Sequence, residues 1–118
     1  MTPPTASADA TLARIHALLD EGRRLPPGEE QLALYARAHA LDLNDAQAMS
    51  HHGAALAVVR KRYEQGIVFC EEAVRRMGPQ PRLLLNLGRA YLAARNKREG
   101  VRALRRAMAR GSDKDPEI

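Results

Sequence analysis

Four histidines are the side chains best suited to metal binding or general base chemistry in this sequence of 118 residues. His51 and His52 are adjacent, and His16 and His39 lie upstream. Neighbouring helical residues point about 100° apart, so adjacent histidines rarely bind one metal ion together. Neither a cysteine nor a carboxylate stands at ligand spacing on the same helical face. We therefore expect no metal site and no cofactor, with His52 packed in a half-buried position and His51 on a groove or the surface.

The other reactive side chains also lack the neighbours that catalysis needs. Cys70, the one cysteine, would need an adjacent base and a field that lowers its pKa. It stands instead at an apolar position of a helical pattern, where a small buried thiol is expected. The pairs Asp20-Glu21 and Glu71-Glu72 occupy adjacent helical positions and diverge, so neither pair can share a proton. The sequence predicts a protein that is not an enzyme.

Arginine side chains are the remaining candidates for a functional role, as a surface that binds anionic partners. The formal net charge is +5, and residues 1–59 carry −3 whereas residues 60–118 carry +8. Arg98, Arg102 and Arg105 recur at i, i+4 and i+7, which places them on one helical face as a basic ridge. A basic ridge could bind phosphates in a salt-sensitive way, or be a solvated surface with no partner. Aromatic residues that stack on bases make up only 3% of the chain, which favours an acidic protein over nucleic acid.

Apolar residues at helical spacing predict the helices that position these side chains. The first helix of each of three pairs repeats one apolar pattern, at 12/15/16/19, 49/52/53/56 and 84/87/88/91. The second helices carry small residues at 33 and 40, 66 and 73, and 100 and 107. Prolines and glycines at 26–28, 78–81 and 111–116 end the patterns. Strand-like stretches are nearly absent, so we predict an all-α fold of six helices in three antiparallel pairs.

The period of these patterns defines the expected domain organisation. Helix pairs recurring about every 34 residues are the signature of a helical repeat array. The expected units are residues 9–44, 45–80 and 81–111, which form a single domain over 9–110. Residues 1–8 are expected to be a disordered lead and residues 112–118 a C-terminal tail.

Each unit contains residues typical of one repeat family. They are Leu84, Asn86-Leu87-Gly88, Ala90-Tyr91, Gly100, Leu104 and Ala107-Met108 in the third unit, Gly53, Tyr63, Gly66 and Ala73-Val74 in the second, and Ala40-Leu41-Asp42-Leu43 in the first. With these residues the third unit, and less fully the other two, resembles the tetratricopeptide repeat family. The resemblance implies a right-handed α-solenoid whose concave face, lined mainly by the first helix of each pair, binds a peptide or helix of a partner.

Carrying the family's groove positions onto this sequence gives nine candidate partner-binding residues. They are Gln47, Ser50, His51, Ala54, Arg82, Leu85, Asn86, Arg89 and Leu92. Some members of the family clamp a terminal carboxylate with Lys, Asn and Arg at set positions. Arg82 and Asn86 match that arrangement, but the first two units supply no matching Lys and Asn, so no such clamp is expected.

These observations predict a non-catalytic protein–protein interaction module, a scaffold or adaptor that binds a peptide or helix. Two alternatives stay open: a bacterial secretion-type chaperone, and a binder of nucleic acid or an anionic surface through the basic ridge. Because the pattern ends just after the sixth helix, we expect an exposed apolar flank containing Leu83, Val101 and Leu104. Self-association, a partner, or a further unit of a longer protein would cover that flank.

The sequence also indicates a location. The N-terminus lacks the basic and apolar regions of a secretory signal, and no apolar run reaches the length of a membrane span. The single cysteine cannot form an internal disulfide. A cytoplasmic protein is expected.

Overall fold

The computed structural model describes the backbone of residues 4–113 and the side chains of residues 8–110. This part of the chain is all-α, with six helices and no strand. The helices are α1 (Pro4–Arg23), α2 (Glu29–Leu41), α3 (Ala46–Val59), α4 (Tyr63–Met77), α5 (Pro81–Ala93) and α6 (Lys97–Asp113). The predicted fold class and number of helices are thus confirmed for the described residues.

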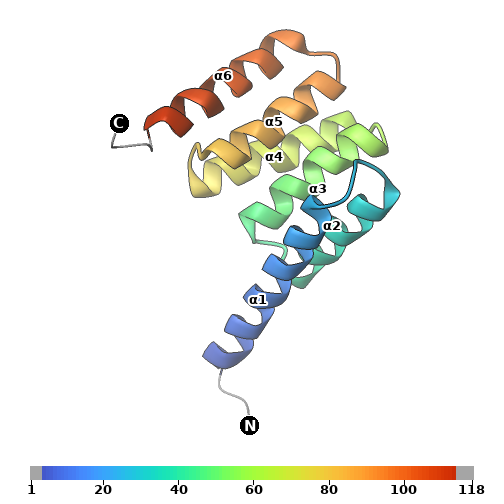
Figure 1. Ribbon diagram of the computed structural model, residues 1–118, viewed down its shortest axis with the longest axis vertical. Coiled ribbons are helices and arrows are strands. Elements are labelled where there is room, and N and C mark those ends of the chain that lie inside the picture. The colour runs from blue at the N-terminus through green and yellow to red at the C-terminus, as the bar shows by residue number, and fades with distance from the viewer. Residues whose placement is uncertain (1–3, 114–118) are drawn as a thin grey trace.

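The helices are stacked in a row that runs from α1 and α2 at one end to α6 at the other (Figure 1). Helices consecutive in sequence pack together as α1 with α2, α3 with α4, and α5 with α6. Contacts of α2 with α3, α3 with α5, and α4 with α5 join these pairs. The molecule measures 52 × 40 × 24 Å. Because a helix with its side chains is about 10–12 Å across, the shortest dimension corresponds to two helix layers.

Local sequence signals explain three of the helix ends. Asp45 precedes α3, and its Oδ1 accepts a hydrogen bond from the backbone N–H of Ala48 at 2.9 Å, as expected for an N-cap. Gly78 follows α4 with φ of +90°, a conformation that glycine adopts without a steric penalty. Pro81 occupies the first turn of α5, where its missing N–H costs nothing.

The first and last helices extend beyond the limits that the sequence suggested for the domain. α1 begins at Pro4, so residues 4–8 belong to a helix where a disordered lead was expected. The alanine-rich residues 5–10 favour a helix, and proline is tolerated in its first turn. α6 continues to Asp113, past the start of the expected tail at residue 112. Residues 1–3 and 114–118, the rest of the predicted lead and tail, lie outside the described residues.

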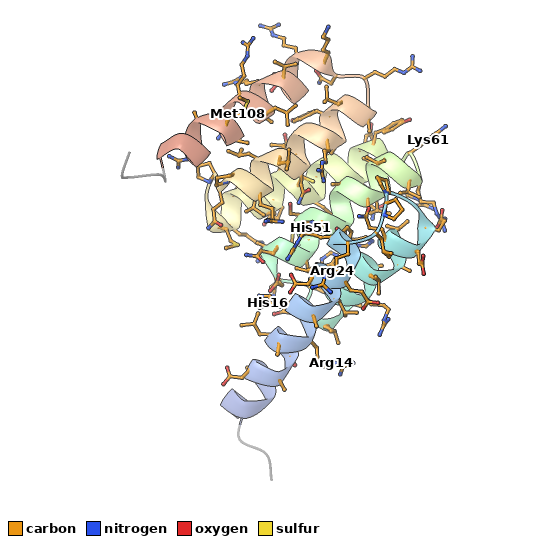
Figure 2. All side chains as sticks on the ribbon, in the orientation of Figure 1. Arg14, His16, Arg24, His51, Lys61 and Met108 are labelled. Atoms are coloured by element: carbon orange, nitrogen blue, oxygen red, sulfur yellow. The ribbon has the colours of Figure 1, made fainter. Side chains whose placement is uncertain are left out.

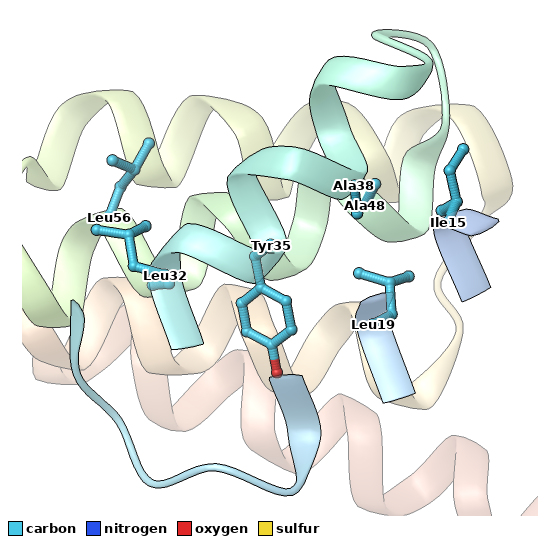
Figure 3. Close-up of a cluster of buried hydrophobic side chains, with 8 residues drawn as sticks. Ile15, Leu19, Leu32, Tyr35, Ala38, Ala48 and Leu56 are labelled. Atoms are coloured by element: carbon cyan, nitrogen blue, oxygen red, sulfur yellow. The ribbon is translucent and has the colours of Figure 1, made fainter. Parts of the chain in front are cut away.

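A cluster of buried side chains joins the first helix pair to α3. Figure 3 shows Ile15 and Leu19 of α1 on one side of the cluster, Leu32 and Leu56 on the other, and Tyr35 of α2 between the two sides. The α3 and α4 helices approach each other closely, because Gly53 and Gly66 lie where their backbones cross. Because glycine has no side chain, these two residues allow the backbones to approach each other closely.

None of the three residues predicted to form an exposed flank is fully exposed, and Leu104 is half-buried. Leu83 is buried at 1% exposure beside Ala46 and Ala73, because it faces the preceding helix pair. Its assignment to the open end was therefore wrong. Val101 is half-buried.

None of the described helices is long and apolar enough to cross a membrane.

Candidate functional site

A cavity of about 370 Å³, here called the central cavity, opens among α1, α2, α3 and α5. It is lined by Arg23 of α1, Leu25 and Pro27 of the following loop, Gln31 and Tyr35 of α2, His51, Ala54, Ala55 and Val58 of α3, and Arg82, Leu85, Asn86 and Arg89 of α5. His51 lies near the middle of the molecule in Figure 2, close to the end of α1.

The loop between α1 and α2 forms one wall of the central cavity. The Gln31 side-chain Nε2 donates hydrogen bonds to the backbone carbonyls of Gly22 at 2.9 Å and Leu25 at 3.0 Å. These carbonyls belong to the C-terminal end of α1 and the residues just after it, where helices leave acceptors without partners. One amide thus fixes the path of the loop and holds Leu25 and Pro27 against the cavity.

A buried polar network forms the floor of the central cavity. The Asn86 Nδ2 donates to Ser50 Oγ at 2.9 Å and lies 3.3 Å from His51 Nδ1. Asn86 is 1% exposed and His51 is 4% exposed. With Asn86 donating to Nδ1, the neutral imidazole carries its proton on Nε2. That Nε2 is buried and has no hydrogen-bond partner among the described residues.

Positive charge dominates the central cavity. Burial, followed by the charges of Arg23, Arg82 and Arg89, lowers the pKa of His51 to about 4. His51 is therefore neutral near pH 7. Arg23 forms an ion pair with Asp20, whereas Arg82 and Arg89 make no ion pair with any residue in the described range. No acidic residue is among the described residues that line the cavity.

The structure brings six of the nine candidate groove residues to the central cavity. They are His51, Ala54, Arg82, Leu85, Asn86 and Arg89. Ser50 is fully buried below the cavity and bonded to Asn86, so it supports the site from beneath. Gln47 is half-buried and Leu92 is exposed beside Gly100, and neither lines the cavity. His51 was expected on a groove or the surface, and the structure places it at the central cavity with its ring buried.

Sequence reasoning missed seven lining residues. They are Arg23, Leu25, Pro27, Gln31, Tyr35, Ala55 and Val58. Most of them come from the first unit, where the repeat pattern is weakest and the loop around Pro27 is irregular. Tyr35 belongs to a second helix, which the family pattern assigns to the outer layer. The one available signal was its size, because Tyr35 is one of only three tyrosines in the chain.

The basic ridge exists as one exposed surface of α6. Arg98, Arg102 and Arg105 are exposed, and they line a shallow depression together with Lys97, Val101 and Arg106. The three ridge arginines form no ion pair within residues 8–110. Further along α6, Met108 is 73% exposed and stands out from the surface (Figure 2).

A histidine pair lies on the other side of α3. His39 Nδ1 and His52 Nδ1 are 2.9 Å apart, and the Phe69 ring lies against both imidazoles. His52 is half-buried, as expected, and burial and then the neighbouring His39 lower its pKa to about 4. One neutral ring donates to the other, which links α2 to α3. No group of three or more potential metal ligands occurs in the part of the chain that the structure describes.

Cys70 is a core residue, as the sequence predicted. It is fully buried, and its thiol donates to the backbone carbonyl of Ser50 at 3.4 Å. Burial, followed by the charge of Glu71, raises its pKa to about 12. Because the reactive form of cysteine is the thiolate, this side chain is inert at neutral pH.

The fold and site together define an all-α protein of stacked helices with a cationic cavity among α1, α2, α3 and α5. No family model matches the chain, and neither a curated protein nor a solved structure matches it. Its function is therefore inferred from the geometry of the cavity.

Proposed function

We propose that this protein is a non-catalytic interaction module that binds a peptide or helix of a partner protein in the central cavity. The observation that carries this proposal is the composition of the cavity, to which α1, α3 and α5 all contribute. The first helix of each pair is the one that lines the concave face of a tetratricopeptide-like array. The proposal includes that right-handed solenoid arrangement and a scaffold or adaptor role.

The chemistry of the cavity suits a partner segment better than a reaction. Its side chains combine apolar surface, such as Leu85 and Val58, with hydrogen-bonding groups and guanidinium ions. His51 is the one lining residue that could act as a base near neutral pH. Its Nδ1 is already engaged by Asn86 and its Nε2 carries the proton, so no lone pair is free for proton abstraction.

Cys70 is an unpaired thiol buried in the core, which agrees with a cytoplasmic location.

The test is partner capture with a matched pair of variants. Leu85 and Leu43 are both exposed leucines, but only Leu85 lines the central cavity. We expect the wild-type protein and the Leu43→Asp variant to capture the same partner from a lysate of the source organism at high salt. The Leu85→Asp variant should lose that partner while keeping its helical circular dichroism spectrum. Equal capture by both variants would refute binding in the cavity.

A second candidate function concerns the basic ridge. Its clustered arginines, without acidic neighbours in the same depression, favour binding to nucleic acid or another anionic surface. Reversing the charge of Arg98, Arg102 and Arg105 would abolish retention on heparin and on nucleic acid if the ridge is the binding site. If retention persists in that variant, the ridge has no such role. A secretion-type chaperone role would use the central cavity and is distinguished by the partner that it captures.

A further inference from the structure

Three observations indicate which kind of ligand would fit the central cavity. The cavity contains three guanidinium groups and no carboxylate among its described lining residues. Two of the three, Arg82 and Arg89, have no ion pair in the described part of the chain. The third observation is the buried Nε2 of His51, an N–H donor without a partner beneath the cavity.

Unpaired donors of this kind favour an acceptor that bears negative charge. A buried N–H group without a partner is destabilising relative to one that donates a hydrogen bond. Hydrogen bonds from guanidinium to carboxylate are charge-assisted, and arginine can make two in parallel. Cationic ligands are disfavoured in the cavity, because burial and then the charges of Arg23, Arg82 and Arg89 already lower the pKa of His51.

The walls of the cavity indicate what carries the negative charge. Leu25, Pro27, Val58 and Leu85 give it an apolar surface next to the arginines. A free inorganic anion would leave this surface exposed to water, whereas a peptide can bury an apolar side chain there. Arg82 and Arg89 are two turns apart on α5, about 10 Å along its axis, so they can hold more than one carboxylate.

We infer that the central cavity binds an acidic segment of the partner protein, with Asp or Glu carboxylates paired to its arginines and an apolar side chain against its leucine and valine wall. This inference rests on the proposed function, since it names the chemical class of the segment that the same site takes. It differs from recognition of a chain terminus, because the charges face a cavity that can hold carboxylates from within a continuous segment.

The experiment is selection from a displayed library of random peptides, with sequencing before and after. The probes are the wild-type protein, the Arg82→Gln/Arg89→Gln variant, and the Arg98→Gln/Arg102→Gln variant as a control with the same change of charge on the basic ridge. Peptides selected by the wild-type and control proteins should be enriched in Asp and Glu at internal positions and retain apolar residues. One selected acidic peptide should bind the cavity variant at least about tenfold more weakly, because each lost ionic hydrogen bond is worth a factor of ten or more.

Nuclear magnetic resonance can follow the pKa of His51, which peptide binding would not change if the arginines had only a structural role. A bound carboxylate should offset the arginine field and raise the pKa of His51 from its value of about 4 in the free protein. A peptide with Gln in place of Glu and Asn in place of Asp should leave that pKa unchanged.

The outcomes separate this inference from the proposed function. Selected peptides that bind the central cavity without acidic enrichment would overturn the inference and leave the proposed function standing. Acidic enrichment that is lost equally in the ridge control would also overturn it, since the charge would then act from the whole surface. Binding of nucleic acid that is lost only in the cavity variant would overturn it in favour of a different class of anionic partner. Failure to select any peptide, together with equal partner capture from the lysate by the Leu85→Asp and Leu43→Asp variants, would refute both.

Discussion

The crossing of α3 and α4 should not tolerate a single added methyl group. A Cβ placed on Gly66 would lie 2.4 Å from the carbonyl oxygen of Gly53 and 3.0 Å from the Cβ of Ala57. Carbon atoms pack best at about 3.5–4.0 Å, so the added atom is roughly 1 Å too close. The obstructing atoms are backbone atoms or a Cβ, which cannot rotate away. The Gly66→Ala substitution therefore forces the two helices apart.

The expected magnitude follows from two opposing effects. Replacing glycine by alanine inside a helix stabilises it by about 1 kcal/mol. Overpacking of a tight core contact costs about 1–3 kcal/mol and more when backbone must move, and the separated helices also lose van der Waals contact around Ala57 and Cys70. We expect a net loss of about 2 kcal/mol of unfolding free energy, which lowers Tm by roughly 10 °C.

Gly100 provides a matched control at the corresponding place in the next helix pair. A Cβ on Gly100 would meet Leu92 Cδ2 at 2.6 Å, but its nearest backbone atom, the Gly88 carbonyl oxygen, is 3.3 Å away. The Leu92 side chain is exposed and free to change rotamer, so Gly100→Ala should alter stability by less than about 1 kcal/mol. Urea and thermal unfolding followed by circular dichroism would measure both variants. If Gly66→Ala is as stable as Gly100→Ala, helix contact at these glycines does not control the packing.

Three further predictions concern pH and the ends of helices. Burial and the three cavity arginines lower the pKa of His51 to about 4 from an ordinary 6.5, so the folded state resists protonation. The contribution of His51 to the free energy of unfolding is complete above pH 6.5 and falls by about 3 kcal/mol as the pH drops to 4. Urea titrations should find a smaller loss over this pH range in the His51→Gln variant. Asp45→Ala removes the α3 N-cap and should cost about 1 kcal/mol in chemical denaturation, whereas a change near zero would contradict the cap. Lys61 has φ of +57°, so Lys61→Gly should stabilise the protein by about 1 kcal/mol and raise Tm, and a lower Tm would contradict this reasoning.

The sequence was a reliable guide to the helices because their signals are local. The start of α3 follows from the side chain of Asp45, and the end of α4 from the conformational freedom of Gly78. Each acts within one turn, so the residues that decide the boundary are adjacent in the chain. The apolar patterns of α3 and α5 similarly identify their buried faces, since helical spacing alone determines which residues share a face.

The candidate site could be predicted only in part, because its residues are distant in sequence. The family resemblance implied that Arg82 and Arg89 of α5 belong to the concave face, and the structure puts both at the central cavity. The contribution of Arg23 could not be predicted, since it depends on how the loop after α1 folds back over α2. The sequence also could not show that Asn86 and His51 bond to each other rather than to a ligand.

The sequence by itself determined that the chain forms six amphipathic helices with small residues where they cross. Tertiary structure alone decided that three arginines and a neutral histidine meet around one cavity. The physical reason is the distance along the chain between the residues that interact. Helix formation depends on backbone hydrogen bonds and side chains within a turn or two, whereas the pKa of His51 depends on burial and on charges that only packing brings together.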